Sequence, residues 1–270
     1  REDNSKKYAI VVAADIATYD RGPARPTGGC GAVAILVGCN APLVFDFDTK
    51  ATSAANTWDF YKPNPSVEYP TVNGMLSQTC YYQALENAYE LHVEKCQKKD
   101  KANISATSSD YWVFHAPYNK LVQKSYARLF LLDARRWHRR QEQPTGESRN
   151  MTTSNDGGDA AEIRKQIPEE YLTKPIEETY ADRTLDGLLK TIACKDFEQR
   201  LRHANFLSQQ IGNTYTASVF MGLCSLISTT SPSPMAHGQT ISVFSYGSGA
   251  LATMYRLTMY VNIALSRVSK

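Results

Sequence analysis

The stretch YWVFHAPYNKLVQKSYARLF, residues 111–130, joins an apolar run to a basic segment through a histidine and a proline. Residues 111–114 predict a buried strand, and residues 118–135 predict a helix. His115 stands where the strand ends, and open α/β sheets bind ligands beyond the carboxyl ends of their strands. This stretch therefore predicts an α/β fold with a candidate site at residue 115.

The regions on either side contain both kinds of element. Residues 8–14 form a continuous apolar run that predicts a strand buried on both faces, and two further strands follow within residues 30–47. Apolar residues recur at helical spacing from residue 73 to about residue 96, and two more helical stretches cover residues 180–208 and 215–229. Polar residues 139–167 predict a loop or disordered insert, and strands return from residue 240. The mixture predicts an α/β protein.

The composition excludes several classes of protein. The chain has 270 residues and a net charge of +3, too small to indicate nucleic-acid binding. Its six cysteines lack the spacing of a disulfide framework or a zinc site, which favours a reducing compartment. Cys80 and Cys224 lie in apolar helical patterns and are expected to be small buried hydrophobes. Neither a membrane span nor a signal peptide is recognisable.

Four polar residues near predicted strand and helix ends allow both a structural and a chemical interpretation. His115 is either a core histidine or a ligand-binding group, and no local base supports a hydrolase triad. Lys120 and Lys124 share one helix face, which is either solvated or able to hold phosphate. Asn213 is either a helix N-cap or an amide donor to a developing oxyanion.

A glycine-rich segment, FSYGSG at residues 244–249, lies between two predicted strands. Gly247 and Gly249 permit a tight hairpin, and they also let backbone N–H groups approach a ligand. The segment is unlike the serine turn of α/β-hydrolases, because no helix follows it.

Taken together, the motifs resemble a known family. VVAADIATYDRGPARPTGGCGAVAILVG, WDFYKPNPSVEYPTVNGMLSQTCYYQAL, FHAPYNKLVQKSYAR, ETYADR, IGNTYTASVF and FSYGSGALATMY resemble hydroxymethylglutaryl-CoA (HMG-CoA) synthase of the eukaryotic type, in that family's order. The resemblance covers nearly the whole chain except residues 133–170. It implies a thiolase-like layered fold whose N-terminal half is incomplete. Residues 1–114 would be the remainder of the first half plus an insertion, and residues 115–270 the second half, with a surface insert around 137–167.

The resemblance also implies a reaction and a set of site residues. Acetyl-CoA would acylate a cysteine, and the acetyl group would then condense with acetoacetyl-CoA to give 3-hydroxy-3-methylglutaryl-CoA, the mevalonate and sterol precursor. His115, Asn213 and Ser248 match the family's catalytic positions. Substrate-binding or supporting positions of the family match Lys120, Lys124, Thr27, Ser77, Asp59, Tyr19 and Gly247. No metal or cofactor is implied, because the CoA thioesters are substrates.

The departures from the family pattern concern the chemistry. The family's nucleophilic cysteine and its acid/base glutamate lie upstream of the matched stretches, and Cys30, Cys39 and Asp15 do not replace them. The chain is therefore expected to be an internal piece that is inactive alone. The alternatives are a non-catalytic paralogue or partner subunit, and a ketoacyl synthase III-like condensing enzyme. The resemblance also implies a homodimer without a membrane or nucleic-acid partner. A cytoplasmic location is expected, and a mitochondrial isoform is the alternative.

Overall fold

The computed structural model describes residues 7–100, 103–142, 158–230 and 235–260. Its centre is a mixed sheet in the order β3-β8-β7-β6. The strands are β3 (Leu43–Ala54), β6 (Tyr111–Phe114), β7 (Thr240–Gly247) and β8 (Leu251–Met259). β6 runs parallel to β7, and the other neighbours are antiparallel. The predicted α/β class is confirmed.

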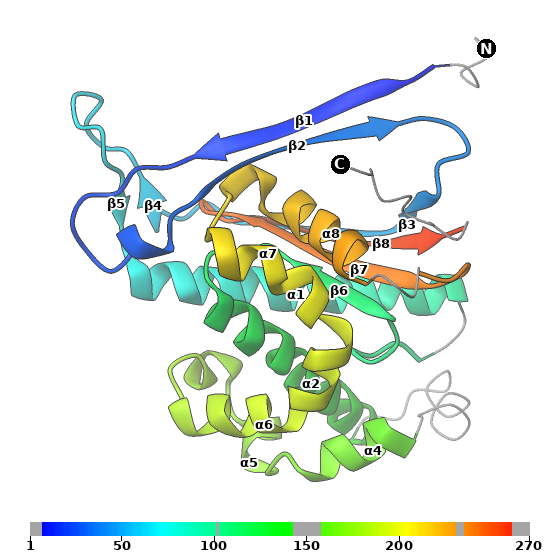
Figure 1. Cartoon of the computed structure of the whole chain (residues 1–270). Coiled ribbons are helices and arrows are strands. Elements are labelled where there is room, and N and C mark those ends of the chain that lie inside the picture. The colour runs from blue at the N-terminus through cyan, green and yellow to red at the C-terminus, as the bar shows by residue number, and fades with distance from the viewer. Residues whose placement is uncertain (1–6, 101–102, 143–157, 231–234, 261–270) are drawn as a thin grey trace.

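Helices cover both faces of this sheet (Figure 1). α1 (Gly74–Asp100) and α2 (Asn119–Glu142) lie on one side, with α4 (Gly158–Lys165), α5 (Glu170–Thr173), η3 (Ile176–Thr179) and α6 (Arg183–Arg200) beyond them. α7 (Arg202–Ile211) and α8 (Ser218–Thr229) lie on the other side, and η4 (Tyr215–Ala217) leads into α8. The layers therefore follow the expected thiolase-like pattern of alternating helices and strands.

The strands divide their side chains between two cores with the period of two that a pleated sheet requires. Trp112 and Phe114 of β6 pack in the larger cluster with α1 and α2, whereas Val113 packs in the smaller cluster with α7 and α8. β7 alternates in the same way, with Phe244 in the larger cluster and Val243 in the smaller one. A single sheet thus fixes both helical layers.

The helix starts follow local sequence rules. Asn73 precedes α1, and its Oδ1 accepts the Leu76 N–H at 3.1 Å. Asp182 precedes α6 and accepts the Leu185 N–H at 2.9 Å. Each side chain satisfies a backbone donor that a helix end would leave unpaired. The expected helix from residue 73 is confirmed and extends to Asp100.

A separate two-stranded ribbon stands above α8 (Figure 1). It is made of β1 (Ala9–Ile16) and β2 (Cys30–Val37), with the short helix η2 (Arg25–Thr27) in the connection. The expectation that β1 is buried on both faces is wrong for this chain, because only Ala13 of β1 is buried. A long apolar run predicts a strand, but burial requires neighbours, and within the described residues β1 pairs with β2 alone.

Two smaller expectations also need correction. Cys224 is exposed on α8, whereas Cys80 is buried as expected, because the apolar residues around position 224 alternate between an inward and an outward face. The insert is not wholly irregular: α2 continues to Glu142, and α4 occupies part of its second half. Residues 143–157 lie outside the described ranges.

The predicted division at residue 114 does not separate two sheets. β3, from the first predicted part, pairs with β8 from the second part, and β6 pairs with β7. The β1–β2 ribbon lies apart from this sheet in Figure 1. The short hairpin β4 (Phe60–Tyr61) and β5 (Thr71–Val72) connects β3 to α1.

Candidate active site

His115 is fixed by its backbone at the end of β6. Its N–H donates to the Phe244 carbonyl at 2.7 Å, which continues the parallel pairing of β6 with β7. Its own carbonyl accepts the Tyr81 hydroxyl of α1 at 2.8 Å. The ring is partly exposed and its centroid lies 6.3 Å from that of Tyr246. Both backbone bonds hold the imidazole at the sheet edge where a ligand is expected.

The imidazole of His115 is surrounded mainly by protein. Burial lowers its pKa to about 4, so the ring is neutral at pH 7. A neutral imidazole offers one N–H donor and one acceptor nitrogen. The ring can therefore donate a hydrogen bond to a carbonyl oxygen without bringing a positive charge into the site.

Ser248 and Gly247 lie in the turn between β7 and β8, and both are exposed. Gly249 in the same turn has a φ of +111°, a conformation that side-chain-bearing residues rarely adopt. Its N–H donates to Asp59 Oδ1 at 3.1 Å, and its carbonyl accepts the Thr57 N–H at 2.8 Å. The predicted hairpin is thus present, and the segment before β4 holds its tip.

Asp59 is the central support of this turn. Its side chain is fully buried, and Oδ1 also accepts the Thr57 hydroxyl at 3.3 Å. Oδ2 is buried without a hydrogen-bond partner in the described part of the chain. Burial and the nearby Asp59 charge raise the pKa of the Tyr246 phenol, so that Tyr246 stays protonated. Asp59 therefore supports the turn that carries Ser248, because its carboxylate accepts the Gly249 backbone N–H.

Asn213 connects α8 to the glycine loop after η2. Its N–H donates to the Thr27 carbonyl at 2.9 Å, and its carbonyl accepts the Gly29 N–H at 2.9 Å. Asn213 Oδ1 accepts the Tyr215 N–H at 2.8 Å, two residues further on, while the N-cap positions of η4 and α8 are Thr214 and Ala217. A Cβ on Gly29 would lie 2.3 Å from the Ile211 carbonyl oxygen, so only glycine permits this approach. Because Oδ1 accepts this bond, the amide NH₂ is oriented and is the remaining donor.

Tyr19 links the Asn213 segment to the Asp59 segment. Its ring centroid lies 6.1 Å from Phe60 in an edge-on arrangement and 6.3 Å from Tyr215. Phe60 directly follows Asp59, and Tyr215 is the residue whose N–H donates to Asn213 Oδ1. The predicted site residues Thr27, Tyr19 and Asp59 are thus joined into one continuous structure.

The His115 segment contacts the same region through the residue that follows it. The Ala116 N–H donates to the buried Ser218 hydroxyl at 2.9 Å, at the start of α8. In Figure 1 the β7–β8 turn, the start of α8, η2 and the β4–β5 hairpin all lie at the left end of the molecule. The structure therefore brings the segments that carry His115, Asn213 and Ser248 to one end of the sheet.

The two lysines differ from each other. Lys120 is exposed in the first turn of α2. Lys124 lies one turn later, and its Nζ is 2.6 Å from Asp186 Oδ2 of α6. The i, i+4 spacing therefore does not present two free cations, because the charge of Lys124 is balanced by Asp186. Ser77 lies in the first turn of α1 at the same end of the molecule, and its side chain is partly exposed.

A buried ionic group behind the site has no counterpart in the sequence predictions. Arg128 Nε lies 2.5 Å from Glu86 Oε1, and both side chains are nearly inaccessible. Arg128 also donates to the Thr179 hydroxyl at 2.7 Å, and its guanidinium carbon lies 5.1 and 4.8 Å from the ring centroids of Tyr82 and Tyr180. The ETYADR motif was the available sequence signal, since it contains Thr179 and Tyr180. The group joins α1, α2 and the segment before α6.

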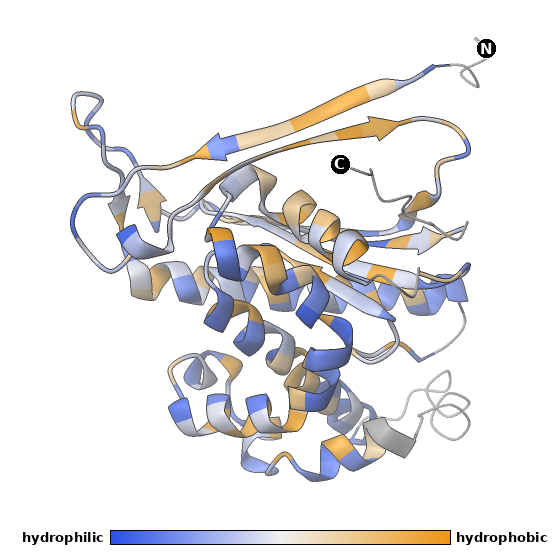
Figure 2. Cartoon of the chain, viewed as in Figure 1, coloured by the Kyte–Doolittle hydropathy of each residue, from blue (hydrophilic) through white to orange (hydrophobic). Residues whose placement is uncertain are grey.

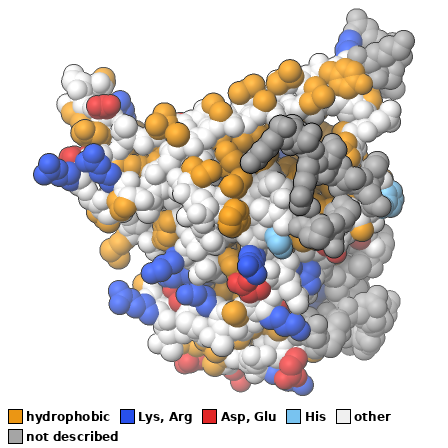
Figure 3. Space-filling view, viewed as in Figure 1, with side chains coloured by type: hydrophobic (Ala, Val, Ile, Leu, Met, Phe, Trp, Pro, Cys, Tyr) orange, Lys and Arg blue, Asp and Glu red, His pale blue; other side chains and the backbone are white. Residues whose placement is uncertain are grey.

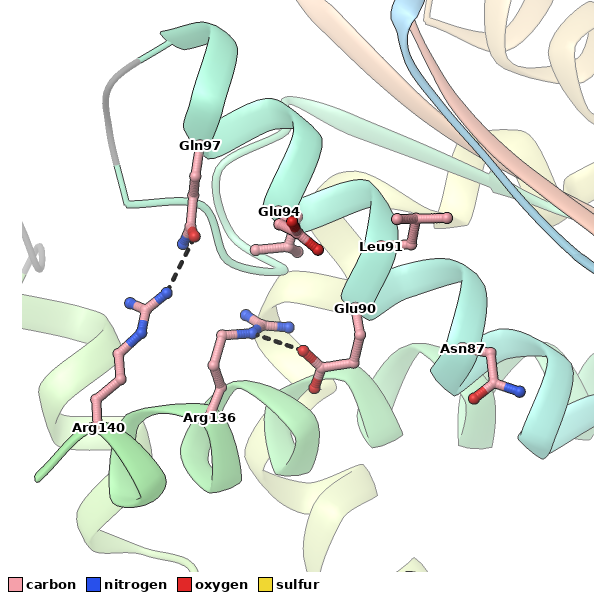
Figure 4. A pocket seen from close by; sticks show the side chains of 8 residues that line it. Asn87, Glu90, Leu91, Glu94, Gln97, Arg136 and Arg140 are labelled. Carbon is pink, nitrogen blue, oxygen red and sulfur yellow. Dashed lines mark hydrogen bonds and ion pairs between the residues drawn. The ribbon is translucent and has the colours of Figure 1, made fainter. Parts of the chain in front are cut away.

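A polar pocket of about 420 Å³ lies between α1 and α2 (Figure 4). Arg136 Nε lies 3.0 Å from Glu90 Oε2, and an Arg140 nitrogen lies 3.0 Å from the Gln97 side-chain oxygen. None of the predicted site residues lines this pocket. It is therefore distinct from the region around His115.

Other chemistries find little support among the described residues. The six cysteines are free, and Cys80 and Cys96 are buried while the other four are exposed. The described ranges contain no group of histidine, cysteine and carboxylate side chains with the arrangement of a metal site. They also contain no helix long and apolar enough to span a membrane.

Comparison with known families identifies the fold and its relatives. Residues 43–270 match the family model described as hydroxymethylglutaryl-coenzyme A synthase C terminal, and residues 2–42 match its N-terminal counterpart. The chain belongs to the HMG-CoA synthase family. The family models divide at residues 42/43, where the ribbon ends and the sheet begins.

HMG-CoA synthases from distant organisms are similar over almost the whole chain. The chain is 38% identical to HMG-CoA synthase A of Dictyostelium discoideum, with 92% of this chain and 47% of the relative aligned. It is 40% identical to the cytoplasmic HMG-CoA synthase of Gallus gallus, with 93% and 45% aligned. It is 37% identical to the mitochondrial HMG-CoA synthase of Sus scrofa. The chain thus spans about half the length of these relatives.

Solved structures agree with this result. MvaS in complex with 3-hydroxy-3-methylglutaryl coenzyme A superposes with a TM-score of 0.69 at 27% identity, over 95% of this chain and 53% of that one. An HMG-CoA synthase complexed with CoA gives a TM-score of 0.62 at 26% identity, over 95% and 50%. The predicted thiolase-like fold is confirmed, and HMG-CoA synthases of twice this span contain it.

Proposed function

We propose that this chain forms the part of an HMG-CoA synthase that binds acetoacetyl-CoA and orients it for condensation with an acetyl group. The observation that carries the proposal is the arrangement, in a member of this family, of the His115, Asn213 and Ser248 segments at one end of the sheet. In the complete reaction, a cysteine thiol displaces CoA from acetyl-CoA. The acetyl methyl group then loses a proton and attacks the ketone of acetoacetyl-CoA. Water finally cleaves the enzyme thioester and releases 3-hydroxy-3-methylglutaryl-CoA.

His115 would donate its N–H to the acetoacetyl ketone oxygen. A neutral donor strengthens as negative charge develops on that oxygen during carbon–carbon bond formation. The depressed pKa keeps the ring in this neutral form at pH 7. The firmly bonded backbone of His115 lets the ring keep its position throughout the reaction.

Asn213 and the Ser248 turn would complete the polar surface around the substrate. The Asn213 amide is held by its bond to the Tyr215 N–H, which leaves its NH₂ as a donor. The turn of Gly247 and Ser248 would present backbone N–H groups of the kind that form oxyanion holes. Asp59 and Tyr19 would preserve this geometry without touching the reacting atoms.

Lys120, Thr27 and Ser77 would contact the CoA portion of the substrate. Lys120 is the lysine of the predicted pair that is exposed and, among the contacts described, not engaged in an ion pair, so it is the better candidate for a CoA phosphate. Lys124 would act mainly through Asp186, by holding α6 against α2. Anchoring of this kind stabilises ground state and transition state equally, and its loss should raise KM more than it lowers kcat.

The nucleophilic thiol and the acid/base carboxylate are assigned to sequence that this chain does not supply. Cys80 and Cys96 are buried, and burial raises the pKa of Cys96 to about 11, which disfavours the reactive thiolate. We further propose a homodimer, acetyl-CoA and acetoacetyl-CoA as substrates, and a cytoplasmic location shared with many relatives, with the mitochondrial form as the alternative.

The test measures binding and acyl transfer separately. The chain is incubated with acetyl-CoA and analysed by intact-mass spectrometry, and no stoichiometric acetyl-cysteine is expected. In the Gallus gallus synthase carrying this chain in place of its matched segment, His115→Ala should weaken acetoacetyl-CoA binding far more than it slows acetylation. The Phe47→Ala variant, at an exposed position of β3, is the control. Equal damage to both half-reactions, or acetylation of the chain alone, would contradict the proposal.

A further inference from the structure

Asn205 of α7 is a polar side chain that the fold buries. It is 4% exposed and borders a small space that is lined mainly by apolar residues of β6, α2, α7 and α8. Hydrophilic residues lie along both α2 and α7 in Figure 2, and Lys and Arg side chains gather over the helical layers in the lower half of Figure 3. Residues on that surface are hydrated, whereas a buried carboxamide costs free energy unless protein groups satisfy it.

Both ends of the Asn205 carboxamide have protein partners. Its Nδ2 donates to Asn119 Oδ1, and its Oδ1 accepts the Ser208 hydroxyl at 2.6 Å. The side-chain amide of Gln209, one turn further along α7, also donates to Asn119 Oδ1 at 3.4 Å. Asn119 and Asn205 are 86 positions apart in the sequence, so one amide oxygen joins the start of α2 to α7.

Asn119 belongs to the segment that carries His115. It is the first residue of α2, and three residues separate it from His115. Within that short connection, the Ala116 N–H donates to the Ser218 hydroxyl at 2.9 Å. Because the connection is short and its backbone is bonded, a shift of the first turn of α2 is transmitted to His115.

Ser208 belongs to the segment that leads to Asn213. Its carbonyl accepts the Gly212 N–H at 3.0 Å, and α7 ends directly before Gly212. Gly212 has a φ of +86°, and a Cβ there would lie 2.8 Å from the Thr27 carbonyl oxygen, so the backbone is closely confined at this point. The hydrogen-bonded chain from Asn119 through Asn205 to Ser208 therefore connects the segment after His115 to the segment before Asn213.

We propose that Asn119 and Asn205 are a pair of positioning residues that fixes the spacing between His115 and Asn213. The inference rests on the proposed function, in which His115 and Asn213 both act as donors around acetoacetyl-CoA. Apolar contacts between helices are non-directional, whereas a hydrogen bond fixes both distance and orientation. Two donors on separate segments must keep that geometry as charge develops on the substrate, and a displacement of about 1 Å can lower the rate about 100-fold.

The test compares two substitutions of Asn119 in the Gallus gallus synthase that carries this chain in place of its matched segment. Asn119→Asp keeps an acceptor oxygen for Asn205, whereas Asn119→Leu has a similar size and removes it. Asn119→Leu should lower kcat for condensation at least about tenfold, while the rate of acetylation changes less than about twofold. Asn119→Asp should keep kcat within about threefold of the wild type. All rates are measured at saturating acetoacetyl-CoA, so that a change in CoA anchoring beside Lys120 does not enter.

Ser242→Ala is the matched control for a general loss of stability. The Ser242 hydroxyl is buried and lies 2.6 Å from the Ser109 hydroxyl, at the opposite end of β6 from His115. Its removal deprives Ser109 of this partner and should lower the thermal stability without changing the ratio of the two half-reactions. A selective loss of condensation in Ser242→Ala, or equal losses of both half-reactions in Asn119→Leu, would overturn the proposal.

Hydrogen exchange in the chain alone tests the link between the two helices without catalysis. Asn119→Leu on α2 should speed exchange of the Gly212 amide after α7 at least about threefold, and Asn119→Asp should not. An unchanged Gly212 rate in Asn119→Leu, or a faster rate with unchanged condensation, would each contradict the positioning role. A hybrid enzyme in which His115→Ala impairs both half-reactions equally would contradict the proposed function instead, and the Gly212 rate would still decide whether the pair couples the two segments.

Discussion

The β1–β2 ribbon and the β3-β8-β7-β6 sheet have similarly apolar strands but opposite environments. Ile10 and Val12 of β1 are 70% and 66% exposed, whereas Val113 of β6 and Phe244 of β7 are fully buried. Both regions are correctly predicted as strands from local sequence. Their difference shows that an apolar run specifies a strand, while burial depends on which other segments are present to cover it.

The largest loss of stability is expected from a cavity in the central sheet. Phe244→Ala removes a ring that contacts Tyr81 and Phe114 at centroid distances of 5.4 and 5.8 Å. We expect the free energy of unfolding to fall by about 4 kcal/mol, since truncation of a buried aromatic leaves a cavity. Urea denaturation followed by circular dichroism measures the change. A loss below about 1 kcal/mol would mean that the sheet is no better packed than the ribbon.

The next comparison concerns the stability that polar side-chain interactions contribute in the two regions. Arg128→Met leaves the buried Glu86 carboxylate without its cation, and we expect a loss of about 3 kcal/mol. The ribbon is tied to η4 by the exposed Asp15–Thr216 bonds, so Asp15→Ala should cost about 1 kcal/mol or less. The same denaturation experiment compares both variants. Equal effects would show that the ribbon is anchored more firmly than its exposure indicates.

The sequence could not predict which of these polar interactions matter most for stability. The Arg128–Glu86 pair joins residues that are 42 positions apart, and Lys124 meets Asp186 from a different helix. Local patterns do predict the helix start at Asn73 and the β7–β8 hairpin, because each depends on a few consecutive residues. The burial of β1 was wrongly predicted for the complementary reason, since it depends on neighbours that the described chain does not provide.

The third prediction concerns the dependence of stability on pH. Burial lowers the pKa of His92, between α1 and β3, from 6.5 to about 4, and its Nδ1 lies 2.7 Å from the Thr49 carbonyl oxygen. Because the folded state favours the neutral ring, the unfolded chain binds more protons below pH 6.5, and stability falls as the pH decreases toward 4.

Between pH 7 and pH 5 this histidine should account for a loss of about 2 kcal/mol. Unfolding curves of the wild type and of His92→Gln measure the difference. The variant should be less stable at pH 7 but less sensitive to acid. The matched control is His237→Gln, at an exposed position, which should keep the full slope. An unchanged slope in His92→Gln would exclude His92 as the source.

The smallest effect is expected on the ribbon itself. Ile10→Thr keeps a β-branched side chain, so the strand preference of β1 is nearly unchanged, and it removes apolar surface that is already 70% exposed. The free energy of unfolding of the chain should therefore change by less than about 0.5 kcal/mol. Urea denaturation followed by circular dichroism measures the change. A large loss of stability would show that the ribbon buries Ile10 more fully than its 70% exposure indicates.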